Sequence, residues 1–274
     1  MTTDSHLFKT EPGPEPLPLW EGKQFHQFDA NFAKPRYWLD EKAARAELMS
    51  PRVKAVRREL VKLGITDEPD PDCIQLNYDS YRMAFRDVGR NTDIRTVIAT
   101  VLPPKRFCPH TVSLEQVYGD VVTTQGHSSK PGLQPAERLY VTSLFNSYVV
   151  DWFIRQSVTA HVSFFFVYNI PVPRLSVSDP CFGLIVQRAA RLTCTTPEFD
   201  DLAQAVGLKS HQDGATDPAE RARLRAELDG LVAHLYGLSE AEFVHILGTF
   251  PLVASAVKVD AHNAYRRVAS GLAK

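Results

Sequence analysis

The sequence changes its hydrophobic pattern once, near residue 175, and this change limits the folds that the chain can adopt. Before it, short β-branched or aromatic runs alternate with turn residues and isolated helical segments, whereas helical spacing persists from Asp179 onward. Strand patterns followed by a run of helices are typical of mixed α+β proteins. We therefore expect an α+β fold, in which a sheet-containing domain with a long helix occupies residues 19–175 and a helical region occupies residues 176–274.

The strand patterns in the first half predict a β-hairpin. Residues 81–88 alternate between polar and apolar, residues 96–102 are β-branched, and residues 89–93 between them have turn chemistry. The hairpin would carry an arginine-rich tip. A third strand is expected within residues 117–124, followed by a surface loop at residues 125–135, which are rich in Gly, Ser and Pro.

Helix signals are distributed along the whole chain. Ser50 can cap a helix that has Pro51 in its first turn and ends at Gly64. A long helix is expected over residues 135–158, and a strand over residues 161–167. Ser239 and Glu242 form a capping-box pattern. The later helices are expected at residues 180–194, 197–206, 217–236, 239–248 and 258–272.

Composition excludes several classes of protein. The formal net charge is −1 and 23% of the residues are charged, so no global basic field indicates a nucleic-acid partner. The four cysteines form no CxxC pair, as expected for reduced thiols rather than a zinc site. No signal-peptide pattern opens the chain, and the most apolar stretch is too short for a membrane helix. We expect a cytoplasmic protein without a membrane partner, in which the proline-rich residues 1–18 form a linker or arm.

No catalytic motif is found in the sequence. It has no Gly-rich cofactor cradle, no GxxxxGK[ST], no Asn-Pro-Pro-aromatic motif, no GxSxG and no HExxH. His234 and His245 lie on helical patterns without a second ligand at helical spacing, so packing is favoured over metal binding. We therefore expect no catalytic residue, no metal site and no bound cofactor in this chain. A nuclease site without a recognisable motif is an alternative that these absences disfavour.

Three blocks of sequence resemble the target-recognition region of bacterial type IIG restriction–modification adenine methyltransferases and of related phage-defence methyltransferases. They are residues 19–29 (LWEGKQFHQFD), residues 81–99 (YRMAFRDVGRNTDIRTVIA) ending in LPP at 102–104, and residues 144–156 (LFNSYVVDWFIRQ), which lead into HVSFF and IPVP. Residues 227–238 (ELDGLVAHLYGL) are similar to the C-terminus of the same family. The resemblance implies recognition of duplex DNA for a methyltransferase domain or subunit that binds S-adenosylmethionine, since the catalytic half of such an enzyme is absent from these residues.

Candidate DNA contacts follow from that implied role. Base edges and phosphates are contacted by cationic, amide and small polar side chains, and three such groups stand within the blocks. They are Lys23, His26 and Gln27; Arg82, Arg90, Asn91, Thr92 and Arg95; and Arg155, Gln156, Thr159 and His161.

Other interpretations of these patterns stay open at this stage. Solvation is favoured over binding as the explanation of the basic face of the helix after Pro51, and Arg86 and Asp87 are equally compatible with a structural ion pair. The aromatic run at residues 164–166 can stack on unpaired bases, but burial in a core is favoured. A different class of function is a protein-interaction module or inactive fragment of a split gene that binds no DNA alone, which the acidic helical tail favours.

Overall fold

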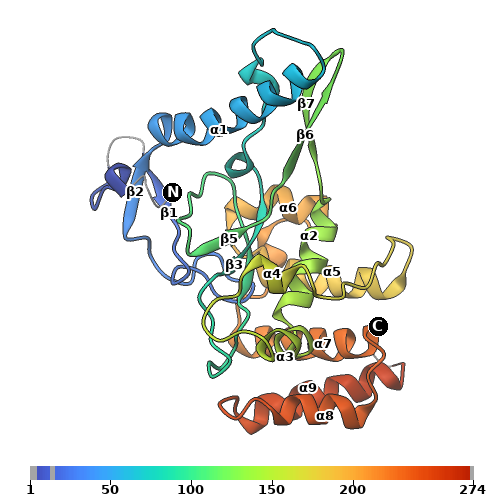
Figure 1. The fold of residues 1–274 in the computed structure, drawn as a ribbon. Helices are drawn as coiled ribbons and strands as arrows, with labels where there is room; N and C mark the ends of the chain where they lie inside the picture. The colour runs from blue at the N-terminus through green and yellow to red at the C-terminus, as the bar shows by residue number, and fades with distance from the viewer. Residues whose placement is uncertain (1–4, 13–15, 272–274) are drawn as a thin grey trace.

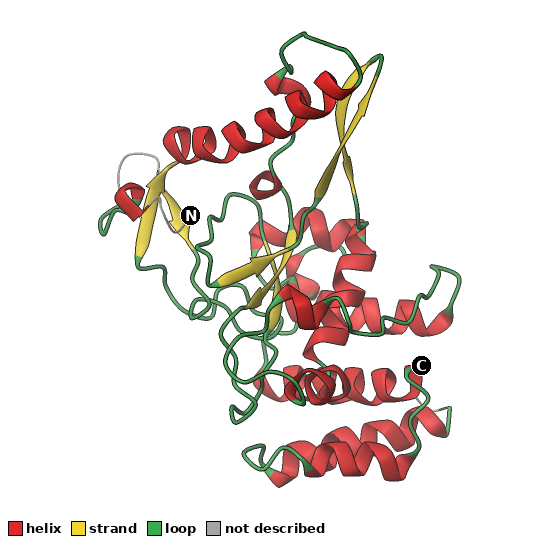
Figure 2. Cartoon of the chain, in the orientation of Figure 1, coloured by secondary structure: helices red, strands yellow, loops and turns green. Residues whose placement is uncertain are grey.

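The computed structural model describes residues 5–12 and 16–271, so residues 1–4 and 13–15 of the predicted arm and residue 272 of the last predicted helix lie outside the described part. Within it, small antiparallel sheets occupy the first half and helices the second (Figures 1 and 2), which confirms the expected α+β class. No helix in the described residues is long and apolar enough to cross a membrane.

The central sheet has three antiparallel strands. β3 (Arg82–Arg86) lies between β4 (Ala99–Leu102) and β5 (Val112–Leu114), with Phe85 opposite Ala99 in the first pair. The predicted hairpin is therefore present, although β5 was not expected. The two hairpin strands are buried almost throughout instead of on one face, and α2 packs against both of them.

Two further hairpins stand apart from this sheet. β1 (Pro16–Leu19) pairs with β2 (Tyr37–Asp40), and β6 (Tyr118–Thr123) pairs with β7 (Gly126–Pro131). The predicted loop at residues 125–135 is thus wrong in part, because it contains β7. Its sequence GHSSKP lacks apolar alternation, and the strand is held by its ladder to β6 while its side chains are mostly exposed or half-buried.

The first long helix, α1 (Glu41–Lys62), begins ten residues earlier than the sequence suggests. Asp40 caps it by accepting a hydrogen bond from the Ala43 amide at 2.9 Å. The prediction that Pro51 opens this helix is wrong, since Pro51 lies inside it. Pro51 and Glu47 are both exposed, so solvent can satisfy the carbonyl group that the proline leaves without a donor. Gly64 follows with φ +77°, the left-handed position expected at this end.

The predicted helix over residues 135–158 is two helices, α2 (Pro135–Asn146) and α3 (Tyr148–Arg155). Ser147 breaks them with an extended ψ of 155°, and its hydroxyl accepts a hydrogen bond from the Val150 amide at 3.2 Å. The Asn146 side chain bonds both the amide and the carbonyl of Ala99 at 2.9 Å, which joins α2 to the sheet. The strand predicted at residues 161–167 is wrong: α4 (Phe164–Val167) is a short helix.

The second half consists of packed helices, as predicted. They are α5 (Pro180–Thr193), α6 (Asp200–Ala205), α7 (Pro218–Leu235), α8 (Glu240–Gly248) and α9 (Ser255–Ala269). The capping box between Ser239 and Glu242 is present at the start of α8. α7 and α9 approach closely at Gly230, where a Cβ atom would lie 2.7 Å from the Tyr265 amide nitrogen. Short 3-10 turns cover Ser5–Leu7, Pro71–Cys73, Asn77–Asp79, Pro197–Phe199 and His211–Asp213.

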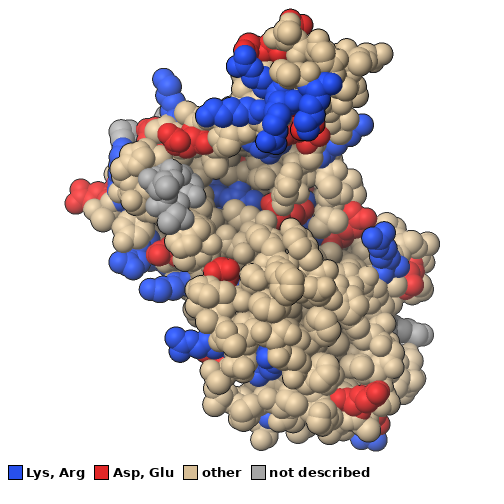
Figure 3. Space-filling model, viewed as in Figure 1, with Lys and Arg blue, Asp and Glu red and all other residues tan. Residues whose placement is uncertain are grey.

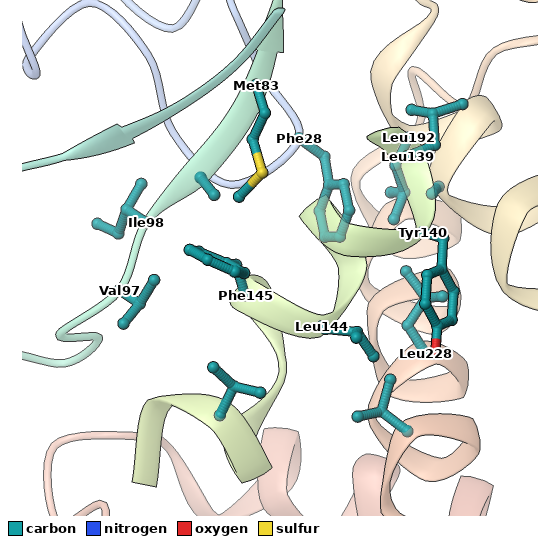
Figure 4. Packing of buried hydrophobic residues seen from close by; sticks show 14 of the residues in the cluster. Phe28, Met83, Val97, Ile98, Leu139, Tyr140, Leu144, Phe145, Leu192 and Leu228 are labelled. Carbon is teal, nitrogen blue, oxygen red and sulfur yellow. The ribbon is translucent and has the colours of Figure 1, made fainter. Parts of the chain in front are cut away.

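One apolar core runs from the sheet into the helical region. Figure 4 shows Met83 and Ile98 of the sheet region facing Phe145 of α2, with Leu192 and Leu228 of the later helices on the other side of α2. This core is continuous across residue 175, and the predicted division into domains at that point stays a prediction. A smaller apolar cluster, which includes Leu19, Leu39 and Phe107, lies beneath β1, β2 and the start of α1.

Candidate nucleic-acid interface

Two of the predicted contact groups meet on one surface of the protein. The loop of residues 88–95, which follows β3, lies beside the corner of residues 156–161, which follows α3 (Figure 1). The Gly89 amide donates to the Ala160 carbonyl at 3.2 Å, and the Val162 amide donates to the Asp87 carbonyl at 2.7 Å. We call the exposed surface of these two segments the loop face.

The loop face presents six of the predicted contact residues to solvent. They are Arg90, Asn91 and Thr92 of the loop and Gln156, Thr159 and His161 of the corner. The His161 Nδ1 atom lies 2.7 Å from Asp87 Oδ2, which fixes the imidazole at the edge of the surface. Lys23 is also exposed, on the segment that passes beside β3 at Gly22 and Arg86.

A buried ion-pair network supports the loop from below. Asp151 of α3 is fully buried, and its carboxylate accepts hydrogen bonds from Arg95 Nε at 2.7 Å and Arg155 Nε at 3.3 Å. The same carboxylate accepts from the Thr96 amide at 3.1 Å. Arg155 also donates to the Asp93 carbonyl at 3.1 Å, so the network holds the C-terminal side of the loop at Asp93, Arg95 and Thr96.

Aromatic rings complete the surroundings of these two arginines. The Arg95 guanidinium lies 4.2 Å from the centre of the Tyr148 ring, and that of Arg155 lies 4.0 Å from the centre of Phe250. Burial by itself favours a neutral guanidinium, yet the carboxylates of Asp151 and Asp229 hold the pKa of Arg95 above its usual value. Arg95 is therefore a cationic support of the loop.

Four of the predicted contacts lie in the interior instead of on a surface. Gln27 donates to the Asn146 carbonyl at 3.1 Å, and Arg82 donates to the carbonyl of Arg106. Arg95 and Arg155 belong to the network around Asp151. Since the side-chain donors of these four residues point into the interior, the four residues are excluded as direct DNA contacts.

His26 is half-buried and lines a cavity of about 310 Å³. The cavity lies next to the loop, and Arg95, Arg225 and Asp229 contribute to its wall. Burial, together with the nearby Arg86 guanidinium, lowers the pKa of His26 to about 4. The imidazole is consequently neutral near pH 7, and it can offer a hydrogen bond to a ligand but no charge.

Asp151 and Asp229 are the important residues that sequence reasoning missed. Burial raises the pKa of Asp229 to about 6, and its Oδ1 atom accepts the Tyr148 amide at 2.9 Å at the start of α3. Asp151 interrupts the apolar helical segment VVDWF, and Asp229 lies among the apolar residues of LDGLV. An acid at such a position is rarely buried unless it is paired, and this is the signal that the sequence offered.

The structure also decides the alternatives for the aromatic run at residues 164–166, for Arg86 with Asp87, and for His234. The favoured burial of residues 164–166 is wrong for Phe165, which is 73% exposed, and for Phe164, which is 41% exposed. Arg86 and Asp87 do not pair with one another, since Arg86 donates to the Phe25 carbonyl. His234 stacks on Tyr265 with ring centres 4.0 Å apart, as packing predicts. Within the described residues, no group of three or more His, Cys, Asp or Glu side chains is arranged to hold a metal ion.

Basic side chains also gather over α1, where they form a visible patch (Figure 3). Several of them are paired on the surface of the protein itself. Arg52 binds Asp120 through two contacts of 2.9 and 2.6 Å, Arg57 lies 3.0 Å from Glu68, and Lys62 lies 2.8 Å from Glu59. This pairing favours the interpretation of the α1 face as a solvated surface.

Comparison with known proteins gives a similarity at the level of structure. No family model and no curated protein sequence matches the chain. Among solved structures, the type IIL restriction–modification enzyme MmeI in complex with DNA matches 98% of this chain with a TM-score of 0.41 and 14% sequence identity. The matched region is 34% of the MmeI chain, so this chain spans about a third of that enzyme's length. Similarity at this level assigns neither a family nor a function.

Proposed function

We propose that this chain recognises duplex DNA through the loop face, for a restriction–modification or phage-defence adenine methyltransferase. The observation that carries the proposal is a loop of base-reading side-chain types, Arg90, Asn91 and Thr92, held on a buried ion-pair network beside the corner that carries Gln156 and His161. The sequence blocks that include both segments support the same role.

Rigid support is the physical reason to prefer this surface over the α1 face. A side chain that reads a base edge must be held in a defined position, because ordering a flexible loop on binding costs free energy. Thr96 donates its hydroxyl to the Arg90 carbonyl at 2.9 Å, and the Arg90 amide donates to Asp93 Oδ2 at 2.9 Å. The loop backbone is therefore largely fixed before any ligand arrives.

The same proposal assigns catalysis to another domain or subunit. Such a partner would bind S-adenosylmethionine and extrude the target adenine, while this chain grips the duplex and sets the sequence that is read. No cofactor is assigned to this chain. Incubation of the purified chain with duplex DNA and S-adenosylmethionine tests this division, and transfer of a methyl group by the chain alone would overturn it.

Binding to duplex DNA is measured first over a salt series. We expect binding at low salt that weakens as salt rises, because released counterions contribute to affinity. Arg90→Glu should weaken binding about tenfold or more, whereas Lys209→Glu is a matched control at an exposed lysine that follows α6, outside the loop face. Asn91→Ala should reduce the preference between sequences by about 1–3 kcal/mol if it reads a base.

The outcomes separate DNA recognition from the alternative of an interaction module. If Arg90→Glu and Lys209→Glu weaken binding equally, contact is non-specific and the loop face is the wrong surface. If the folded chain binds no duplex at low salt, the proposal fails for this chain, and the alternative of a protein-interaction module or inactive fragment replaces it.

A further inference from the structure

Another cavity lies away from the loop face and is lined by a buried arginine. It has a volume of about 420 Å³ and lies between α1, the 3-10 turn Asn77–Asp79 and the strands β3 and β5. Arg82 lines it and is only 2% exposed. Figure 3 shows the surface hollowed beneath α1, with basic side chains inside the hollow.

Arg82 lacks the partner that a buried cation requires. Its Nη2 atom donates to the Arg106 carbonyl and lies 4.0 Å from Cys108 Sγ, while its Nε atom is buried without a hydrogen-bond partner. Within the described part of the chain, no carboxylate forms a salt bridge with Arg82, whereas Arg52 on the same wall is paired with Asp120 at 2.6 Å. A buried guanidinium without an anion is strongly unfavourable.

The neighbouring thiol does not supply the missing negative charge. Burial raises the pKa of Cys108, and the nearby Arg82 offsets only part of that effect. The thiol therefore stays protonated near neutral pH. The other walls are largely apolar and include Leu48, Phe107 and Val112.

We propose that this cavity binds a small amphipathic anion, whose carboxylate or phosphate head pairs with Arg82 and whose apolar body contacts Leu48, Phe107 and Val112. The volume lies within the range of ligand-binding cavities, and one placed charge in a mostly apolar wall is their usual composition. A guanidinium forms short charge-assisted hydrogen bonds with either head group. This inference is independent of DNA recognition, because the loop face contributes no residue to the cavity.

Calorimetric titration with octanoate and octyl phosphate tests the proposal on the purified chain. Both probes should bind, and the tighter one identifies the preferred head group. Octanamide, which keeps the apolar body but is neutral, should bind at least about tenfold more weakly. Inorganic phosphate, which has no apolar body, should also bind more weakly. Equal binding of octanamide and octanoate would overturn the role of Arg82, and equal binding of inorganic phosphate and octyl phosphate would overturn the apolar contact.

Two variants separate ligand binding from folding. Arg82→Met fills a similar volume without charge, so it should abolish the preference for octanoate while the melting temperature of the free protein stays equal or rises. Leu48→Trp keeps the charge and narrows the cavity, and it should weaken both octanoate and octyl phosphate about tenfold or more. Unchanged octanoate affinity in either folded variant would refute the site. If Arg82→Met does not fold, Leu48→Trp and the neutral probe still decide the question.

Discussion

Replacing Asp151 by asparagine removes the negative charge at the centre of the loop support and leaves the volume nearly unchanged. In the wild-type protein the carboxylate is fully buried, and the two arginine side chains that it pairs with are 9% and 7% exposed. Asparagine can still accept the Thr96 amide through its side-chain oxygen. The variant therefore tests the charge of Asp151, separately from its packing.

The expected loss follows from the two cations that stay behind. Breaking a buried ion pair by removing one partner typically costs about 3–5 kcal/mol, because the other charge is left uncompensated. In the variant, the negative charge of Asp229 still stabilises the Arg95 cation, and so does the Tyr148 ring, whose centre lies 4.2 Å from the guanidinium. The lower end of that range therefore applies. We expect Asp151→Asn to lower the free energy of unfolding by about 3 kcal/mol, out of the total of about 5–15 kcal/mol that is typical of proteins.

Urea unfolding at pH 7 measures this loss directly. Glu68→Gln is the matched control, since it breaks the Arg57–Glu68 pair, whose side chains are 58% and 64% exposed. An exposed pair contributes about 0–1 kcal/mol, so the control should change stability little. Amide exchange at residues 90–95 should also accelerate in Asp151→Asn. A loss no larger than that of Glu68→Gln would refute the argument that this network holds the loop.

Three other substitutions probe the same region. Gly89→Ala should destabilise the protein by about 2 kcal/mol or more in thermal melts, because its Cβ atom would lie 2.2 Å from the Thr96 carbonyl oxygen; Gly119→Ala, where no atom lies within 4 Å, is the control. Burial raises the pKa of Asp229 to about 6, so the folded state binds this proton more tightly than the unfolded state does. The stabilisation that results is full below pH 4 and is lost as the pH rises through 6. Asp229→Asn should therefore be about 2–3 kcal/mol more stable than wild type at pH 8 and equal to it at pH 4, by urea unfolding at both pH values. The pKa of His26 is lowered to about 4, so the unfolded state takes up this proton first as the pH falls. The free energy of unfolding is therefore unaffected by His26 above pH 6.5 and decreases as the pH falls toward 4. His26→Gln should flatten the melting temperature between pH 6.5 and 4, and an unchanged profile would contradict this assignment.

The elements that the sequence predicts well are those that local signals determine. The helices α5, α7 and α8 each begin at a residue whose side chain caps them, and the β3–β4 hairpin has turn residues between two strand patterns. By contrast, β7 exists because β6 offers a ladder, and α1 continues through Pro51 because that proline faces solvent. Neither condition is visible in a window of sequence, since both depend on the tertiary neighbours.

The candidate site shows the same division between local and distant causes. The exposed loop tip with Arg90, Asn91 and Thr92 was predictable, because turn residues at a hairpin tip reach solvent. The burial of Arg95 was not, since its partner Asp151 lies 56 residues away. In the opposite direction, Phe165 is exposed although its residue type favours a core. Residue type alone therefore assigned arginine to the surface and phenylalanine to the interior, and the fold reversed both.

This reversal has a consequence for how the loop face can bind DNA. With Arg82, Arg95 and Arg155 inside, the predicted contacts that still offer a cation on or beside the loop face are Arg90 and Lys23, while His161 is paired with Asp87. Each phosphate contact contributes about −0.9 to the slope of log affinity against log salt, so the isolated chain should give a slope of only about −2. A slope that shallow means weak non-specific binding and recognition by polar side chains. The methyltransferase partner would then supply most phosphate contacts, and a measured slope steeper than about −5 would place the DNA on another surface, such as the basic face of α1.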